Sequence, residues 1–216
     1  MGPGQARQQA IDNSTNDYIT FIDAGDIFIS QEVQVEMAQK VYENPDTNVF
    51  FWLYYYKDKL VTHANNRMHG KVYKRQFLEK YHVRFSPAGS RMNEDIGFNR
   101  TCRIISREIE VPILQFDTPV IHWIYNENSL TQKDDQAALY RDQTMGLAIN
   151  SINCIETCRR NGFDTRPEIN QIAAHLYYWF IETLVHRPEF AQRSWDGARL
   201  FYLHYSRDII VANTNI

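Results

Sequence analysis

Two groups of carboxylates have the residue types and spacing that chemistry on a polar substrate requires. Asp23 and Asp26 directly follow the apolar run at residues 18–22, and Glu94 and Asp95 form an adjacent pair further along the chain. Carboxylates placed together can hold a divalent cation such as Mg²⁺ or Mn²⁺, because these hard cations prefer oxygen ligands. An aspartate is also ionised at neutral pH and can accept the proton of a hydroxyl group.

Each group also has an ordinary structural explanation. An Asp-x-x-Asp sequence after a strand is most often only a loop. Glu94 and Asp95 equally suit the first turn of a helix capped by Asn93, where acidic side chains interact favourably with the helix dipole. Neither pair alone therefore decides between a catalytic site and a plain loop or helix end.

The elements around the carboxylates are those of an α/β fold. Residues 18–22 are predicted to form a buried strand that delivers Asp23 and Asp26 to its C-terminal end, where open α/β sheets bind their ligands. A helix with proline in its first turn is expected at residues 3–11, and Ser30 is expected to cap another. Further helices are expected at 31–42, 74–81 and 94–106, and strands at 48–56, 60–63, 109–116 and 120–125.

The chain after Asp134 has a purely helical pattern. Apolar residues recur at helical spacing on both sides of the Asn161-Gly162 turn, Thr165 and Glu168 match a capping box, and a last helix is expected at 193–210. The sequence therefore predicts an α/β domain with a mixed, partly Rossmann-like sheet at residues 1–131. A C-terminal helical extension at 132–216 is expected to pack on it.

Composition limits the function classes. The chain has 216 residues, a net charge of −3 and three cysteines. We expect a reduced, cytoplasmic protein with no membrane span and no general affinity for nucleic acid, which would require an excess of lysine and arginine. A cluster of cations is nevertheless present, and it is either a basic patch or a solvated face: Lys71, Lys74, Arg75, Lys80 and Arg84.

Three motifs occur in an order that resembles one enzyme family. They are Gly2-Pro-Gly-Gln-Ala-Arg-Gln8, Tyr18-Ile-Thr-Phe-Ile-Asp-Ala-Gly-Asp26 and Asn93-Glu94-Asp95. Together they resemble the Ala-Arg helix, the acidic loop after a strand and the Glu-Asp pair of family-two glycosyltransferases, which have the GT-A fold. Gly25 and Gln8 depart from the commonest form of these motifs, since an aspartate and an asparagine often occupy those positions.

The resemblance implies an inverting transfer of a sugar from a nucleotide-sugar donor, with a UDP-sugar favoured, to a hydroxyl of a carbohydrate or other acceptor. Asp23 and Asp26 would bind the donor and a Mg²⁺ or Mn²⁺ ion, and Arg7 would contact the donor phosphate. Asp95 would be the catalytic base, and Glu94 would orient it or bind the acceptor.

The resemblance also assigns residues to the acceptor side of the site. The segments 68–75 and 77–85 look like the part of the family that builds that side before the Glu-Asp pair, and 122–131 resembles the strand and turn that follow it. His69, Lys71 and Trp123 are the candidates on this side. Trp123 and Tyr125 are aromatic side chains that can stack on a sugar, although core packing explains them equally well.

The family usually places βα units that bind the nucleotide before the Ala-Arg helix, and the sequence begins at that helix. We therefore expect a partner chain or self-association to cover the edge of the sheet. The alternative function is a non-catalytic or split half of a transferase that binds a partner chain or an acceptor. A nucleotidyltransferase is a weaker alternative, because no basic phosphate-binding loop is visible beyond Arg7.

Overall fold

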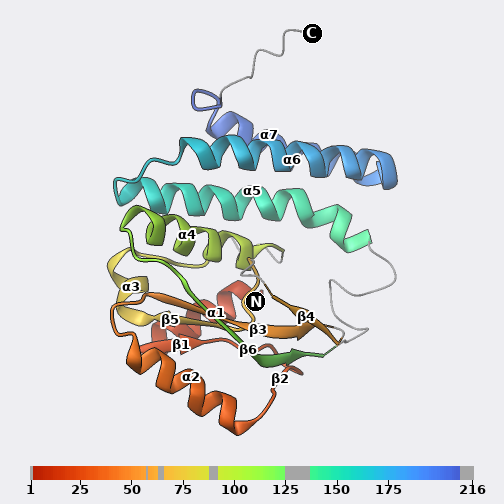
Figure 1. The fold of residues 1–216 in the computed structure, drawn as a ribbon. Coiled ribbons are helices and arrows are strands. Elements are labelled where there is room, and N and C mark those ends of the chain that lie inside the picture. Colours follow the sequence, from red (N-terminus) through yellow and green to blue (C-terminus); the bar gives the residue numbers. More distant parts are fainter. Residues whose placement is uncertain (1, 57, 63–65, 88–91, 125–136, 210–216) are drawn as a thin grey trace.

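A mixed sheet of six strands forms the centre of the protein (Figure 1). The computed structural model describes residues 2–56, 58–62, 66–87, 92–124 and 137–209. The strand order is β1-β5-β3-β6-β2, and β4 pairs with β3 on its own. The strands are β1 (Tyr18–Thr20), β2 (Ile27–Phe28), β3 (Val49–Tyr56), β4 (Lys59–Val61), β5 (Lys71–Lys74) and β6 (Leu114–Trp123).

The pairing directions bring several strand ends to one edge of the sheet. β3 and β6 run parallel, while β5 runs antiparallel to both β1 and β3. The C-terminal ends of β1, β3 and β6 therefore lie at the same edge as the N-terminal end of β5. This edge receives the acidic loop that follows β1.

Helices cover both faces of the sheet and explain the continuous apolar run of β3, whose residues from Val49 to Tyr54 are all buried. One face packs on α2 (Gln31–Glu43) through Met37 and Val41. The other face packs on α4 (Glu94–Glu108), with contributions from α1 (Pro3–Asn13) and α3 (Arg75–Lys80).

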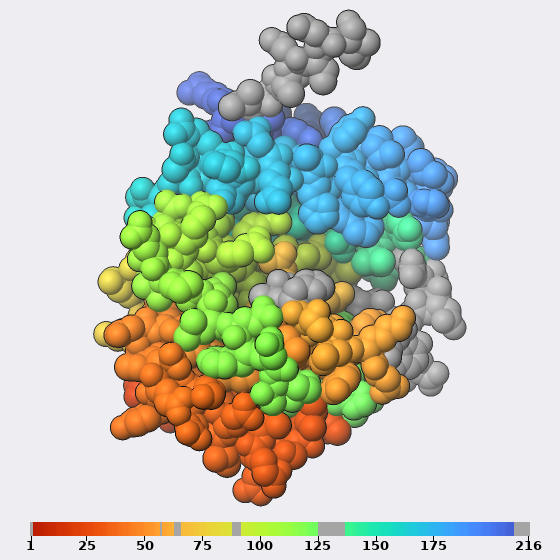
Figure 2. Space-filling model, in the orientation of Figure 1, coloured from red at the N-terminus to blue at the C-terminus, as the bar shows by residue number. Residues whose placement is uncertain are grey.

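The C-terminal helices form further layers on the outer side of α4 (Figures 1 and 2). They are α5 (Ala137–Arg160), α6 (Arg166–His186), the short 3₁₀ helix η1 (Pro188–Phe190) and α7 (Ala191–His204). Gly97 lets α4 approach α5 closely, because a Cβ atom at this position would lie 2.7 Å from the carbonyl oxygen of Asn150. A separate core that includes Leu147, Leu176 and Phe201 holds the three long helices together.

Most expected elements are present, and this confirms the predicted α/β fold class with a C-terminal helical region. The predicted division after residue 131 falls in 125–136, outside the described residues, and remains a prediction. None of the helices in the described ranges is long and apolar enough to cross a lipid bilayer.

Several local predictions were wrong. Residues 114–123 form one strand instead of two, because irregular register against Trp52 and Leu53 of β3 absorbs the expected turn. Strand β5 was not predicted. Thr165 precedes α6 without a side-chain cap, and its hydroxyl accepts a hydrogen bond from Arg159 at 3.1 Å. The last helix begins at Ala191 and ends at His204.

The buried strand expected at residues 18–22 is also shorter than predicted, and it is an outer strand of the sheet. β1 has three residues and pairs with β5, its one partner strand among the described residues. Ile19 is nevertheless buried. The expectation that another chain covers this edge remains a prediction.

Candidate functional site

Two aspartates and a histidine meet at the edge of the sheet where β1 ends. Asp23, Asp26 and His69 each offer one ligand atom, and these atoms all lie within 4.8 Å of one another. The Nε2 atom of His69 is 3.0 Å from Oδ2 of Asp26 and 3.9 Å from Oδ2 of Asp23. Sequence analysis predicted the two aspartates together but placed His69 on the acceptor side.

A tight turn after β1 brings the two aspartates together. The N–H of Asp26 donates to the carbonyl of Asp23 at 3.0 Å, and Gly25 adopts a φ of +99°, which favours glycine. The N–H of Ile124 donates to Oδ1 of Asp26 at 3.0 Å and fixes this carboxylate to the end of β6. The Asp26 side chain is buried, whereas that of Asp23 is 44% exposed and open to a ligand.

His69 is held by aromatic rings and by a glycine turn. Its ring stacks on Trp123 with centroids 4.5 Å apart and lies 5.2 Å from the ring of Tyr54. Gly70 has a φ of +67°, and a Cβ atom there would lie 2.2 Å from the carbonyl oxygen of Trp52. Only glycine fits this backbone position, which directs His69 toward the aspartates.

Arg7 of α1 links the acidic loop to the N-terminus of α4. Its guanidinium donates to Oδ1 of Asp23 at 2.6 Å and to Oε1 of Glu94 at 2.8 Å. Burial lowers the pKa of Arg7, but the two carboxylates outweigh burial and raise it above its usual value. Both sides of the guanidinium fork are occupied and the side chain is 12% exposed, so Arg7 orients carboxylates here. Contact of Arg7 with a donor phosphate remains a prediction.

Glu94 and Asp95 begin α4 and lie largely out of water. Burial raises the pKa of Glu94, and the adjacent Asp95 adds to this effect, whereas Arg7 opposes it. Burial likewise raises the pKa of Asp95, while Arg67, Arg7 and Lys71 lower it. A carboxylate whose pKa is raised toward neutrality is a stronger base, and this suits the role predicted for Asp95.

The loop before β5 is fixed to α4 by Asn99, which the sequence analysis missed. The Asn99 amide donates to the carbonyls of Asn66 at 3.0 Å and Arg67 at 3.3 Å, and its oxygen accepts the Tyr73 hydroxyl at 2.7 Å. This network holds the loop that carries His69. Asn99 could have been recognised in the sequence as a polar residue among the apolar positions of the helix expected at residues 94–106.

Two of three comparisons with known proteins found matches. The sequence profile described as glycosyl transferase family 2 matches residues 1–109. The chain belongs to this glycosyltransferase family. None of the curated proteins matches the sequence of this glycosyltransferase.

Solved structures show the same fold at low sequence identity. S. aureus TarS 1-349 in complex with UDP aligns with a TM-score of 0.50 and 13% identity, over 98% of this glycosyltransferase and 74% of TarS 1-349. A second crystal structure of S. aureus TarS 1-349 gives a TM-score of 0.50 and 14% identity, over 95% of this chain and 71% of TarS 1-349. This likeness confirms the GT-A fold.

The donor set of the site fits a divalent cation. Two carboxylates and one imidazole are common ligands of divalent metal ions in proteins. The Nδ1 atom of His69 is buried with no hydrogen-bond partner among the described residues. Metal binding at Nε2 would replace its contact with Asp26 and place the ring proton on Nδ1. The glycosyltransferase thus has a group of side chains that can hold a metal ion.

Lys71 and Trp123 are the other two residues predicted on the acceptor side, and both contact other protein groups in the structure. Lys71 is 3% exposed, and its ammonium donates to the carbonyl of Arg67. Burial lowers the pKa of Lys71 to about 7, although Asp95 opposes this shift. The ring of Trp123 contacts His69, the Arg67 guanidinium at 4.7 Å and the ring of Tyr56 at 4.2 Å.

The side chains of Lys71 and Trp123 therefore both contact other residues of this glycosyltransferase. Contact of either with an acceptor remains a prediction. Tyr125 and the remainder of the segment to residue 131 lie outside the described residues.

Proposed function

We propose that this chain is a metal-dependent, inverting glycosyltransferase that moves a sugar from a UDP-sugar to an acceptor hydroxyl. One observation carries the proposal. Arg7 joins the Asp23–Asp26–His69 group to the Glu94–Asp95 pair by two short ion pairs, in a chain of this family. A group able to hold a metal and donor phosphates is thereby coupled to a pair of carboxylates able to act as base.

Asp23, Asp26 and His69 are the residues that would hold the cation. A bound divalent ion neutralises the charge that develops on the leaving diphosphate. We expect Mn²⁺ to bind more tightly than Mg²⁺, because Mg²⁺ favours oxygen ligands and an imidazole suits a transition metal better. The presence of UDP in the TarS 1-349 structure supports a uridine nucleotide as donor.

Asp95 would act as the general base. Its carboxylate would take the proton of the acceptor hydroxyl as that oxygen forms a bond to the anomeric carbon. The bond from the anomeric carbon to the diphosphate would break on the opposite face, and the nucleoside diphosphate would leave with the bonding electrons. Glu94, held by Arg7 at 2.8 Å, would keep the start of α4 oriented rather than accept the proton itself.

The test is calorimetric titration of the chain with UDP, with and without Mn²⁺, repeated on Asp26→Asn. The variant keeps the shape of the side chain but removes the charge, so metal-dependent binding should weaken by about tenfold or more. Asp164→Asn is the matched control, because Asp164 is an exposed acid before α6 that pairs with Arg166.

Absence of UDP binding to the folded wild-type chain in Mn²⁺ would contradict the proposal. That result would favour the alternative, a non-catalytic half that binds a partner chain or an acceptor. If UDP binds, the anomeric configuration of the transferred sugar, measured by NMR, tests inversion separately.

A further inference from the structure

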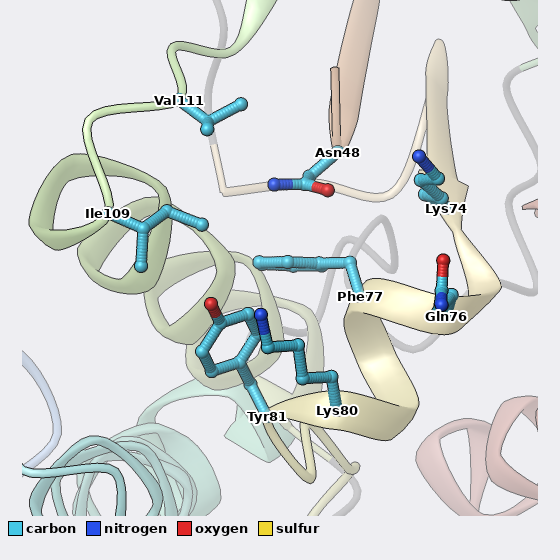
Figure 3. A pocket seen from close by; sticks show the side chains of 8 residues that line it. All are labelled: Asn48, Lys74, Gln76, Phe77, Lys80, Tyr81, Ile109 and Val111. Atoms are coloured by element: carbon cyan, nitrogen blue, oxygen red, sulfur yellow. The ribbon is translucent and has the colours of Figure 1, made fainter. Parts of the chain in front are cut away.

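A cavity lies at the end of β5 that is remote from the acidic group (Figure 3). Its volume is about 370 Å³, within the range of sites that bind small molecules. Lys71 begins β5 beside His69, and Lys74 ends the strand at this cavity. At about 3.4 Å per residue, the Cα atoms of these two lysines are roughly 10 Å apart, so the cavity is distinct from the proposed donor site.

The inner surface of the cavity is apolar. The ring of Phe77 projects into it from α3, and Ile109 and Val111 line it from the segment that follows α4 (Figure 3). Phe77 is 3% exposed and so is fixed in place, while Ile109 and Val111 are half-buried. Because the Phe77 ring is almost inaccessible, the apolar surface on which a ring compound can pack is formed by the half-buried Tyr81, Ile109 and Val111.

The outer part of the cavity is cationic. Lys74 and Lys80 line it, and none of the eight lining residues is acidic. The Lys74 ammonium donates to the carbonyl of Pro45 at 2.5 Å, and the Lys80 ammonium lies 5.1 Å from the centroid of the Tyr81 ring. Within the described part of the chain, neither ammonium forms an ion pair with a carboxylate. The cavity therefore presents two positive charges without a balancing negative charge.

The other cations of the same segment are already occupied. Arg75 pairs with Glu79 on α3, and Arg84 donates to the carbonyls of Leu78 and Val83. Lys71 is directed into the acidic site, as described above. The basic cluster seen in the sequence is therefore neither a uniform patch nor a uniformly solvated face. Lys71 is buried and donates to the carbonyl of Arg67, and the two accessible lysines of the cluster line the cavity.

We propose that this cavity is a second binding site, for a small phosphorylated ring compound. The ring packs on Ile109, Val111 and the ring of Tyr81, and the phosphate interacts with the ammonium groups of Lys74 and Lys80. An ammonium has three donors, and Lys74 uses one of them on Pro45. Two positive charges suit a dianion better than a single carboxylate. The amides of Asn48 and Gln76 and the hydroxyl of Tyr81 also line the cavity and can supply further hydrogen bonds.

The experiment is calorimetric titration of the full chain with phenyl phosphate. We expect a dissociation constant below about 1 mM, and binding at least about tenfold weaker for inorganic phosphate and for benzyl alcohol, each of which lacks half of the required chemistry. Glucose 6-phosphate is the second probe. Tighter binding of phenyl phosphate identifies a flat ring as the ligand, whereas tighter binding of glucose 6-phosphate identifies a sugar ring.

Variants locate the site. Lys74→Gln combined with Lys80→Gln should weaken phenyl phosphate binding by at least about tenfold, since each removes a charged partner of the phosphate. Lys80→Gln alone, at the exposed last residue of α3, provides a variant that folds if the double variant does not. Lys40→Gln is the matched control, an exposed lysine of α2, and Asp26→Asn should also retain binding.

Three results would overturn the proposal. They are no binding of either ring phosphate to the folded chain, equal affinity for inorganic phosphate, and equal losses in Lys40→Gln and Lys80→Gln. Loss of binding in Asp26→Asn alone would place the ligand in the acidic site instead. Failure of UDP to bind would leave this proposal intact, so the two proposals are tested separately.

Discussion

Replacement of Arg7 by methionine tests whether this side chain holds the site together. Arg7→Met keeps the length and the apolar part of the side chain but removes both ion pairs. The pair with Glu94 is largely buried, with side chains 12% and 11% exposed, whereas Asp23 is 44% exposed. We assign about 2 kcal/mol to the buried contact and about 1 kcal/mol to the exposed one, which gives a loss of about 3 kcal/mol in the free energy of unfolding.

The assay is urea unfolding followed by circular dichroism. Arg166→Met is the matched control, because Arg166 pairs with Asp164 in full contact with water, and its urea midpoint should not move. A double-mutant cycle with Glu94→Gln should give a coupling energy of about 1–2 kcal/mol. Equal midpoints for Arg7→Met and Arg166→Met, or purely additive effects with Glu94→Gln, would refute the reasoning.

Three further predictions concern the base, the helix contact and the histidine. Asp95→Asn should lower kcat for sugar transfer by about 10²–10⁴-fold. It should also raise the urea midpoint at pH 7 but not at pH 3. Burial raises the folded-state pKa of Asp95, so ionisation of this carboxyl opposes folding as the pH rises. An equal change in the midpoint at both pH values would contradict this. Gly97→Ala should cost about 1–3 kcal/mol, measured by urea unfolding, because the added methyl group meets the backbone of Asn150 at 2.7 Å; an unchanged midpoint would show that α5 moves away without cost. His69→Phe should keep the stacking on Trp123 but weaken Mn²⁺ binding in calorimetry by about tenfold or more, whereas unchanged affinity would remove His69 from the metal site.

The sequence determined features that depend on neighbouring residues. Ser30 is the N-cap of α2 as predicted, and its hydroxyl accepts the N–H of Val33 at 3.4 Å. The apolar run at residues 48–56 predicted the strand that is β3. The acidic residues after β1 and at the start of α4 are recognisable by residue type, and the family resemblance predicts their roles. Such signals are local or periodic, so one sequence carries them completely.

The tertiary structure alone decided which distant residues share the site. His69 joins the aspartates because β5 runs antiparallel to β1, and β5 is too short to show a clear periodic signal. Arg7 binds Glu94, 87 positions away in the chain, and this link between two groups of carboxylates is not visible in the sequence. Thr165 lost its capping role because Arg159 reaches its hydroxyl. Charged and polar side chains choose partners by distance in the folded chain, and that distance is set by packing of the whole core.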